Sequence, residues 1–167
     1  MRDWLTELEL EPHPEGGYFR RMYTASGAVG TPYGERALAT SIQYLLTAEQ
    51  PRGRLHRNRS DILHFLLDGG PIEYVTVDAD GALTRVLLGA ENERYLLVPG
   101  GHWKASQLVA GARQGLVAEV VTPGFDYADH EFAEVKDLAA WPQLVDELRP
   151  FLPGQGQGQG PGTGPGV

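Results

Sequence analysis

Short apolar runs, each closed by a turn rich in glycine or proline, recur along this chain and limit the folds that it can adopt. The clearest pair is residues 72–77 and 83–88, which flank an Asp-Ala-Asp-Gly turn at residues 78–81. An Asp-Gly turn between β-branched and apolar residues is typical of a β-hairpin. Eight or more such runs, with helical patterns only at the two ends, predict an all-β sandwich or barrel.

The alternation of side chains within each run predicts the two faces of each strand, because successive side chains of a strand point to opposite sides. In residues 38–46, Ile42 and Tyr44 share one face and Gln43 lies on the other. In residues 18–24, Arg20 and Arg21 likewise fall on opposite faces. A loop is expected at residues 25–35, and the remaining predicted strands are residues 62–67, 72–77, 83–88, 94–98, 102–109 and 116–121.

The two ends of the chain differ from the middle. Residues 4–10 predict a short helix capped by Asp3, and the apolar spacing in residues 137–152 predicts a helix that begins at Pro142. Residues 153–167 alternate glycine with Gln, Pro and Thr and carry too few apolar side chains to offset the entropy of ordering. The sequence therefore predicts one domain over residues 1–152 and a disordered tail over residues 153–167.

Charge and composition exclude several classes of function. The net charge is -8 and the pI is near 5.0, so no basic face is available for nucleic acid. The chain has no cysteine, which removes disulfides, thiolate metal sites and cysteine nucleophiles. The first ten residues are too acidic for a signal peptide, and no run of eighteen apolar residues occurs. A cytoplasmic protein with no membrane partner is expected.

The stretch 53–69 carries the densest set of chemically active side chains. Arg54, His56, Arg57 and Arg59 lead into an apolar run that contains His64. In an acidic protein, these residues indicate a pocket wall that meets an anion or an oxygen-rich ligand. The alternative is a strand edge with solvated arginines, together with a core histidine whose hydrogen bonds are satisfied within the protein.

Five motifs, in this order, resemble a group of small cupins, which are single-domain jelly-roll proteins largely of unknown function. The motifs are His-Pro-Glu-Gly-Gly-Tyr-Phe-Arg (13–20), Leu-Ala-Thr-Ser-Ile-Gln-Tyr-Leu-Leu (38–46), Leu-His-Arg-Asn-Arg-Ser-Asp (55–61), Leu-Val-Pro-Gly-Gly-His-Trp (97–103) and Thr-Pro-Gly-Phe-Asp-Tyr-Ala-Asp (122–129). The resemblance covers residues 10–152 and implies a cupin jelly-roll barrel with short terminal helices. It also implies a likeness in shape to dTDP-4-keto-6-deoxysugar 3,5-epimerases and germin-like proteins.

The resemblance bears on metal binding, because many cupins hold a metal with a His-x-His pair, a Glu and a further His. The matching positions here carry Arg54, His56, Ile62 and Lys104, so one of the four ligands is present. Zinc and iron generally need about three protein ligands. A metal-free pocket with no cofactor is therefore expected. A non-standard site built from His56, His64 and His102 stays open as an alternative.

Proton-transfer chemistry at a carbonyl group needs a base with a pKa near neutral and a cation for the developing enolate. His56 is the predicted base, and Arg54 and Lys104 are the predicted anion-binding cations. The candidate catalytic residues are His56, His64 and Lys104. The candidate substrate-binding residues are Arg20, Gln43, Tyr44, Arg54, His102 and Glu119.

Several of these candidates have plainer interpretations. Arg20 could brace the N-terminal loop with Glu119 as its partner, His102 could cap a turn, and Tyr44 could fill the core. His13 and His130 lie in predicted loops beside prolines or acids, and both are interpreted as structural or solvated.

The leading hypothesis is a metal-independent cupin enzyme that acts on a small carbonyl-bearing molecule by isomerisation, epimerisation, cyclisation or elimination. The alternatives are a non-catalytic cupin that binds a polar metabolite and a metal-dependent dioxygenase. The resemblance also implies a homodimer, formed through the N-terminal segment and a sheet face, to which Tyr18, Phe19 and Tyr44 are expected to contribute.

Overall fold

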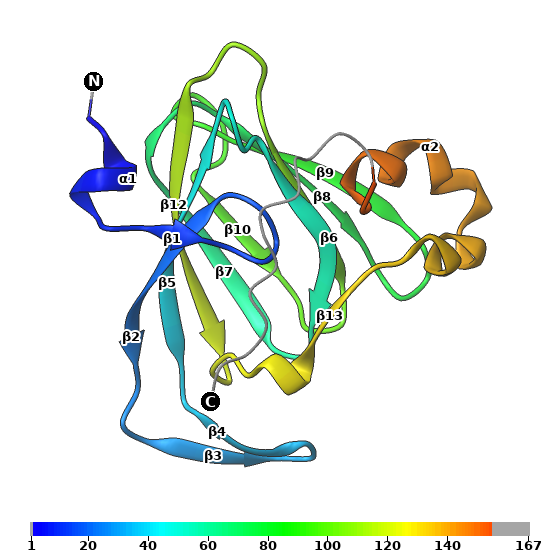
Figure 1. Ribbon diagram of the computed structural model, residues 1–167. Helices are drawn as coiled ribbons and strands as arrows, with labels where there is room; N and C mark the ends of the chain where they lie inside the picture. The colour runs from blue at the N-terminus through cyan, green and yellow to red at the C-terminus, as the bar shows by residue number, and fades with distance from the viewer. Residues whose placement is uncertain (1, 155–167) are drawn as a thin grey trace.

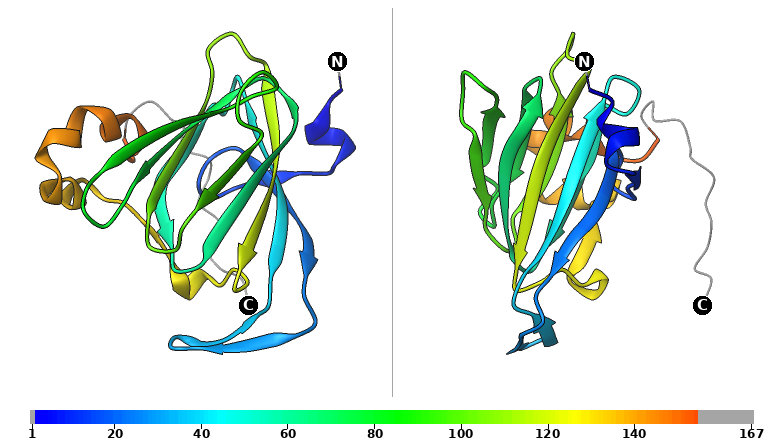
Figure 2. Two further views of the ribbon diagram at one scale, coloured as in Figure 1. Left: turned by 180° about the vertical axis from the view of Figure 1, so that it is seen from behind. Right: turned by 90° about the vertical axis from the view of Figure 1, so that its left-hand side faces the viewer.

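The computed structural model describes residues 2–154, and in these residues two antiparallel sheets face each other (Figures 1 and 2). The six-stranded sheet has the order β1 (Glu11–Pro12), β2 (Tyr18–Thr24), β5 (Thr40–Thr47), β12 (Gln114–Thr122), β7 (Asp61–Gly69), β10 (Tyr95–Val98). The five-stranded sheet has the order β13 (His130–Phe132), β6 (Arg52–Asn58), β11 (Trp103–Leu108), β8 (Ile72–Val77), β9 (Leu83–Leu88). The predicted all-β jelly roll is confirmed.

The predicted hairpin is present as β8 and β9. Val77 pairs with Leu83, and Gly81 in the turn has a φ of 81°. Asp78 Oδ1 accepts hydrogen bonds from the backbone N–H groups of Asp80 and Ala82, both at 2.9 Å. This use of an aspartate side chain to close its own turn is the reason that the sequence signal was clear.

Apolar side chains form three clusters, one between the sheets and one on the outer face of each sheet. The cluster between the sheets includes Tyr44, Leu66 and Tyr74 and fills one end of the barrel. Outside the six-stranded sheet, Leu45 packs against the N-terminal segment. Outside the five-stranded sheet, the C-terminal segment packs against Trp103 and its neighbours.

The terminal helices are shorter than predicted. The first is α1 (Trp4–Glu7), with Asp3 at its N-cap as expected. The predicted C-terminal helix is replaced by η2 (Val135–Ala140), η3 (Pro142–Leu144), α2 (Val145–Leu148) and η4 (Arg149–Phe151). Pro142 and Pro150 each lack the N–H group that a continuous helix needs, so the segment breaks into single turns. The predicted tail lies, apart from Pro153 and Gly154, outside the described residues.

The loop predicted at residues 25–35 is wrong, because the chain there forms an arm. Strands β3 (Ala28–Thr31) and β4 (Gly34–Ala37) pair with each other and with neither main sheet, and they project from one end of the barrel (Figure 1). Arg36 on this arm donates two hydrogen bonds, of 2.7 and 3.0 Å, to the carboxylate of Asp129 in η1 (Tyr127–Asp129). The arm is thereby fixed beside the segment that precedes β13.

The inward positions of the strands change from apolar to polar along the barrel. On β12, Val117 lies in the apolar cluster, and the next side chain on the same inward face is that of Glu119. On β7, Leu66 lies in the apolar cluster, and the neighbouring inward-facing side chain is that of His64. Glu119 and His64 are direct partners in the β12–β7 register. The polar half of the barrel interior therefore begins at this level and holds the candidate site. In residues 2–154, no helix has the length and hydrophobicity needed to cross a membrane.

Candidate active site in the polar half of the barrel

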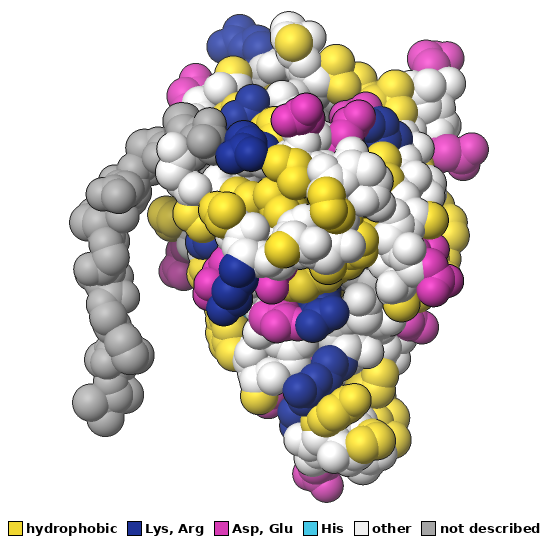
Figure 3. Space-filling model, turned by 90° about the vertical axis from the view of Figure 1, so that its right-hand side faces the viewer, with side chains coloured by type: hydrophobic (Ala, Val, Ile, Leu, Met, Phe, Trp, Pro, Cys, Tyr) yellow, Lys and Arg dark blue, Asp and Glu magenta, His cyan; other side chains and the backbone are white. Residues whose placement is uncertain are grey.

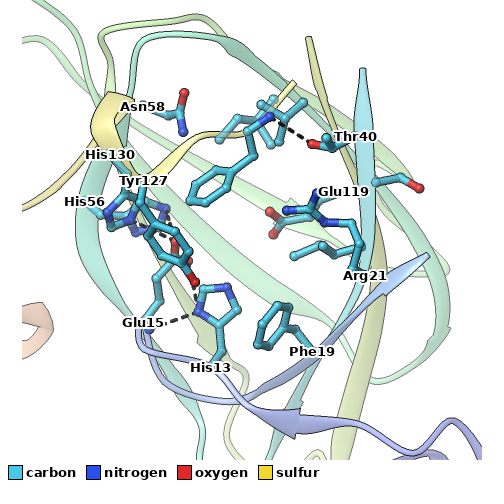
Figure 4. A pocket seen from close by; sticks show the side chains of 15 residues that line it. His13, Glu15, Phe19, Arg21, Thr40, His56, Asn58, Glu119, Tyr127 and His130 are labelled. Carbon is cyan, nitrogen blue, oxygen red and sulfur yellow. Dashed lines mark hydrogen bonds and ion pairs between the residues drawn. The ribbon is translucent and has the colours of Figure 1, made fainter. Parts of the chain in front are cut away.

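A pocket opens at the polar end of the barrel, between the two sheets (Figure 4). His13, Glu15, His56 and His130 lie on one side, and Arg21 and Glu119 lie on the other. The remaining lining residues are mostly apolar or aromatic: Phe19, Thr40, Ser41, Ile42, Asn58, Ile62, Val121, Phe125 and Tyr127. All five histidines are buried or half-buried, and none is visible on the face of the molecule that Figure 3 shows.

Three groups in this pocket form a compact cluster, which we call the Glu15–His56–His130 cluster. Glu15 Oε1 lies 3.1 Å from His130 Nε2 and 3.3 Å from His56 Nε2. The two imidazole rings stack with centroids 5.2 Å apart. His56 Nδ1 lies 2.6 Å from the carbonyl oxygen of Arg54, so Nδ1 carries a proton and Nε2 is directed to Glu15.

The turn before β2 places Glu15 in the pocket. Its backbone carbonyl accepts a 2.6 Å hydrogen bond from the N–H of Arg54, and its N–H donates to His13 Nδ1 at 3.0 Å. Tyr44 Oη donates to the carbonyl of Gly16. Gly17 has a φ of 69°, and a Cβ atom there would lie 2.6 Å from the carbonyl oxygen of Leu45, so this turn requires glycine.

The cluster combines an ionised carboxylate with a neutral imidazole. Burial opposes the ionisation of Glu15, but His56, His13 and the hydrogen bond from His130 together hold its pKa well below the usual range. Burial lowers the pKa of His56 to about 4, against the favourable charge of Glu15. At neutral pH the Nε2 atom of His56 therefore carries a lone pair and faces the pocket beside a negative charge.

A second polar group lies deeper in the barrel and consists of His64, Lys104 and Glu119. Lys104 Nζ lies 2.8 Å from His64 Nε2 and 3.3 Å from Glu119 Oε2. His64 Nδ1 lies 3.2 Å from the carbonyl of Leu96, so Nδ1 donates and Nε2 accepts from the ammonium. Burial, followed by the charge of Lys104, lowers the pKa of His64 well below its usual range, which keeps the imidazole neutral.

The predicted catalytic residues therefore fall into two neighbouring groups. His56 lines the pocket, whereas His64 and Lys104 lie behind it, and of the deeper group only Glu119 lines the pocket. Lys104 and His56 are direct partners in the β11–β6 register, which explains why the two groups adjoin. His64 is completely buried, and Lys104 is 3% exposed.

The predicted substrate-binding residues are more scattered. Arg20 and Gln43 are register partners on the outward face of β2 and β5, and they lie outside the pocket. The alternative interpretation of Arg20 as a brace of the N-terminal segment fits its hydrogen bonds to Glu9 and to the carbonyl of Leu8, although its acidic partner is not Glu119.

Of the other four predicted substrate-binding residues, Glu119 lines the pocket, whereas the remaining three do not. Tyr44 is 2% exposed and belongs to the apolar cluster. The Arg54 guanidinium stacks on Phe132, 4.0 Å from the ring centroid, and its Nε atom is buried with no hydrogen-bond partner in residues 2–154. His102 borders a separate crevice beside Ser60 and Pro99.

Sequence reasoning selected only His56 and Glu119 among the residues that line the pocket and missed, among the polar ones, Glu15, Arg21 and Asn58. His13 and His130, interpreted as structural or solvated loop residues, also line the pocket. The available signal was the motif His13-Pro-Glu15, in which a histidine and a glutamate precede a pair of glycines. His130 gave no such signal, because its proximity to His56 arises only when β13 pairs with β6.

The usual cupin metal position does not fit the residues present, because Arg54 and Lys104 are cations and Ile62 has no donor atom. The Glu15–His56–His130 cluster does fit a metal ion, since its ligand atoms all lie within 4.8 Å of one another. Ligands bonded at about 2.0 Å to one tetrahedral zinc ion lie roughly 3.3 Å apart. The distances from Glu15 Oε1 to the two imidazole nitrogens, 3.1 and 3.3 Å, are close to this value. Within the part of the chain that the structure describes, this cluster replaces the predicted set of His56, His64 and His102.

Comparison with known proteins agrees with the geometry. The jelly-roll barrel with a polar pocket at one end places the protein among the cupins. The chain belongs to the family described as Cupin superfamily (DUF985), whose model matches residues 2–133. A curated relative, the uncharacterized protein YML079W of Saccharomyces cerevisiae, is 36% identical over 155 residues, which cover 82% of this chain and 77% of the relative.

Solved structures show the same fold. A hypothetical protein from Leishmania major superimposes with a TM-score of 0.83 at 30% identity, covering 89% of this chain and 96% of that one. Protein SO0799 from Shewanella oneidensis gives 0.81 at 29% identity, covering 91% and 98%. Oxalate decarboxylase from Bacillus subtilis gives 0.56 at 19% identity, covering 91% of this chain and 40% of the enzyme, a likeness of fold alone.

The buried histidines predict that acid destabilises the protein. The pKa of His56 is about 4 in the folded protein and 6.5 in the unfolded chain. Between pH 4 and pH 6.5 the unfolded chain therefore binds more protons than the folded protein does. The free energy of unfolding is therefore greatest above pH 6.5 and falls as the pH drops toward 4. The contribution of His56 to this fall is on the order of 3 kcal/mol, because each pKa unit corresponds to about 1.4 kcal/mol.

Urea denaturation at several pH values measures this effect. We expect His56→Gln to lose less stability than the wild type between pH 6.5 and pH 4, while Arg20→Gln on the outer face retains the wild-type dependence. An identical pH dependence in wild type and His56→Gln would contradict the neutral, buried state of His56.

The buried pair of Lys104 and Glu119 predicts strong coupling between the two side chains. Removal of one partner leaves the other charge buried and unpaired, which typically costs about 3–5 kcal/mol. We expect Lys104→Met to lower the free energy of unfolding by this amount and the double variant Lys104→Met/Glu119→Gln to recover much of it. Chemical denaturation of the two single variants and the double variant measures the coupling, and simple additivity would refute it.

Proposed function

We propose that this cupin is an enzyme that moves a proton on a small carbonyl-bearing molecule, with His56 as the general base and with no metal ion required. The observation that carries the proposal is the state of His56. Its Nδ1–H is committed to the carbonyl of Arg54, and its Nε2 lone pair faces the pocket beside the Glu15 carboxylate. A base held in this way accepts a proton without a change of ring orientation.

The proposed reaction balances with protein groups alone. His56 Nε2 takes a proton from the carbon next to the carbonyl group, and the electron pair of that C–H bond moves onto the carbonyl oxygen to form an enolate. With its pKa lowered by burial to about 4, His56 is a weaker base than the near-neutral one expected from the sequence, and the adjacent Glu15 carboxylate stabilises the imidazolium ion that results. The proton then returns to the same carbon, to give epimerisation, or to another position, to give isomerisation. No oxidant or reductant is consumed.

The buried ammonium of Lys104 supports this chemistry from behind the pocket wall. It neutralises Glu119, which lines the pocket, and so limits the negative charge next to a developing enolate. Lys104 has no direct access to the pocket, and we therefore assign it a positioning role. His64 orients Lys104 through the 2.8 Å contact and acts in the same way.

A second candidate function is metal-assisted chemistry, favoured by the spacing of the Glu15–His56–His130 cluster. Glu15, His56 and His130 would hold the ion, which would polarise a carbonyl oxygen of the substrate. Both candidates require His56. They differ over His130, which a metal site needs as a ligand and which the proposed base does not.

Deuterium exchange tests the proposed reaction. The protein is incubated in D2O with a panel of small ketones and oxo acids, and proton NMR follows exchange next to the carbonyl group. We expect His56→Gln to lower the exchange rate at least 100-fold, in line with the usual contribution of a general base. Arg20→Gln, on the outward face of β2, should leave the rate unchanged. If compounds of the panel bind but exchange no faster with the wild type than with His56→Gln, the proposed reaction is refuted. The protein would then be a binding protein without this activity.

Elemental analysis of protein purified without a metal-affinity tag separates the two candidates. The metal-free proposal predicts less than about 0.1 metal ion per chain and retention of exchange in His130→Asn. Near-stoichiometric zinc, iron, manganese or nickel that is lost in both His56→Gln and His130→Asn would establish the second candidate instead.

We also propose a homodimer. Of the predicted contributors, Phe19 and Tyr44 face the barrel interior and Tyr18 packs against the N-terminal segment, so the surface that supports the proposal is a different one. Four apolar side chains are exposed on the outward face of β7 and the edge strand β10: Phe65, Leu67, Tyr95 and Leu97. An edge strand with an exposed apolar face is a surface that proteins commonly cover by association.

Light scattering at micromolar concentration tests the dimer. We expect a mass of two chains for the wild type and a shift to the monomer for Leu97→Asp, which places a charge on this face. Val135→Asp, at an exposed position of η2, should remain dimeric. A monomeric wild type would refute the proposal.

The proposed setting is the cytoplasm, with a small molecule as the partner rather than nucleic acid or a membrane. A net charge of -8 supports the exclusion of nucleic acid, and the lack of cysteine is consistent with a reducing compartment.

A further inference from the structure

Asn58 presents a hydrogen-bond donor that has no partner within the described part of the chain. The residue ends β6 and is 4% exposed. Its Oδ1 atom accepts a 2.9 Å hydrogen bond from the N–H of Ser60. Only the oxygen of an amide can accept such a bond, so the orientation of the group is fixed and Nδ2 points the other way.

The Nδ2 atom of Asn58 is buried and makes no hydrogen bond within residues 2–154, yet Asn58 lines the pocket (Figure 4). Buried amide groups in proteins nearly always have a partner, because an unsatisfied donor costs free energy. An oxygen acceptor on a bound molecule would supply one. His56 is two residues earlier on the same face of β6, so an oxygen bound by Asn58 brings its neighbouring carbon to the side of the pocket where His56 lies.

Arg21 supplies a cation on the opposite wall. It pairs in register with Ile42, and it lines the pocket from the rim of the six-stranded sheet, whereas Asn58 belongs to the five-stranded sheet. The guanidinium donates to Thr24 Oγ1 at 3.2 Å and takes part in none of the ion pairs found within residues 2–154. Arginine in this state is suited to a carboxylate, which it can bind through two parallel hydrogen bonds.

The pocket between these two walls is small and largely apolar. Ile42, Ile62 and Val121 line it, together with the aromatic rings of Phe19, Phe125 and Tyr127, and its volume is about 40 Å³. A single water needs roughly 10–15 Å³ measured in this way, so the enclosed part holds only a few heavy atoms. Glu119, the acidic group on this side, is already paired with Lys104.

We propose that the pocket binds a short oxo acid, with its carbonyl oxygen on Asn58 Nδ2, its carboxylate on Arg21 and an apolar chain between them. This inference rests on the proposed function, because it names the class of substrate whose proton His56 would move. Asn58 is then the group that receives the carbonyl oxygen, and Arg21 selects acids over neutral ketones.

Isothermal titration calorimetry with three matched probes tests the inference on the full chain. Levulinate carries both groups, pentanoate lacks the carbonyl oxygen, and 2-pentanone lacks the carboxylate. We expect levulinate to bind at least tenfold more tightly than either analogue. Equal binding of the three probes, or no binding of levulinate at millimolar concentration, would overturn the inference.

Variants assign the two contacts. In Asn58→Leu, we expect levulinate to bind only as tightly as pentanoate does, and the affinity for pentanoate to be unchanged. In Arg21→Gln, we expect levulinate to bind only as tightly as 2-pentanone does. Arg20→Gln is the matched control, since the neighbouring arginine faces outward and pairs with Glu9. An equal loss in Arg20→Gln and Arg21→Gln would show that the effect is one of overall charge and would overturn the assignment.

The side-chain amide of Asn58 gives a readout in the wild type that does not depend on the folding of a variant. We expect its proton NMR resonances to shift with levulinate and to stay in place with pentanoate, and a resonance unmoved by bound levulinate would refute the contact. Binding does not require turnover, so the two proposals can fail separately. Levulinate that binds as predicted without deuterium exchange refutes only the proposed reaction. Exchange on neutral ketones that is unaffected by Arg21→Gln refutes only the oxo-acid assignment.

Discussion

The buried charge of Lys104 is the constraint on which the polar half of the barrel depends. Lys104 is 3% exposed, and an ammonium group buried to this extent is stable only when an opposite charge and hydrogen-bond acceptors surround it. Glu119 supplies the charge and the neutral imidazole of His64 supplies an acceptor, and the two are register partners on neighbouring strands of the opposite sheet. The same group explains the departure from the usual cupin ligand set, because a fixed cation occupies a position that commonly binds a metal.

The two halves of the barrel divide structural and chemical roles. One end is filled by the apolar cluster around Tyr74 and is supported on both outer faces by the terminal segments. The other end is open, and it gathers ionisable groups, among them His56 and His64, whose pKa values are lowered by burial. A packed end that holds the sheets in register allows the open end to carry groups that contribute little to stability, such as the unsatisfied amide of Asn58.

Segments far apart in the sequence complete the site. The turn that carries Glu15 comes from the N-terminal part of the chain, and His130 comes from the last strand, 115 residues later. The arm of β3 and β4 reaches Asp129 through Arg36 and is thereby fixed to the segment that bears His130.

The sequence by itself determined the class of fold, the main strands and their faces. It did so because alternation, turn residues and apolar spacing are local properties, and the β8–β9 hairpin is encoded in a few consecutive residues. The family motifs also identified His56 and the loss of the usual metal ligands. The sequence alone could not show that Glu15 and His130 meet His56, or that Gln43 faces away from the pocket. Those facts depend on which strands pair and in which register, and only the tertiary structure decides that, because such pairing is a property of the whole barrel.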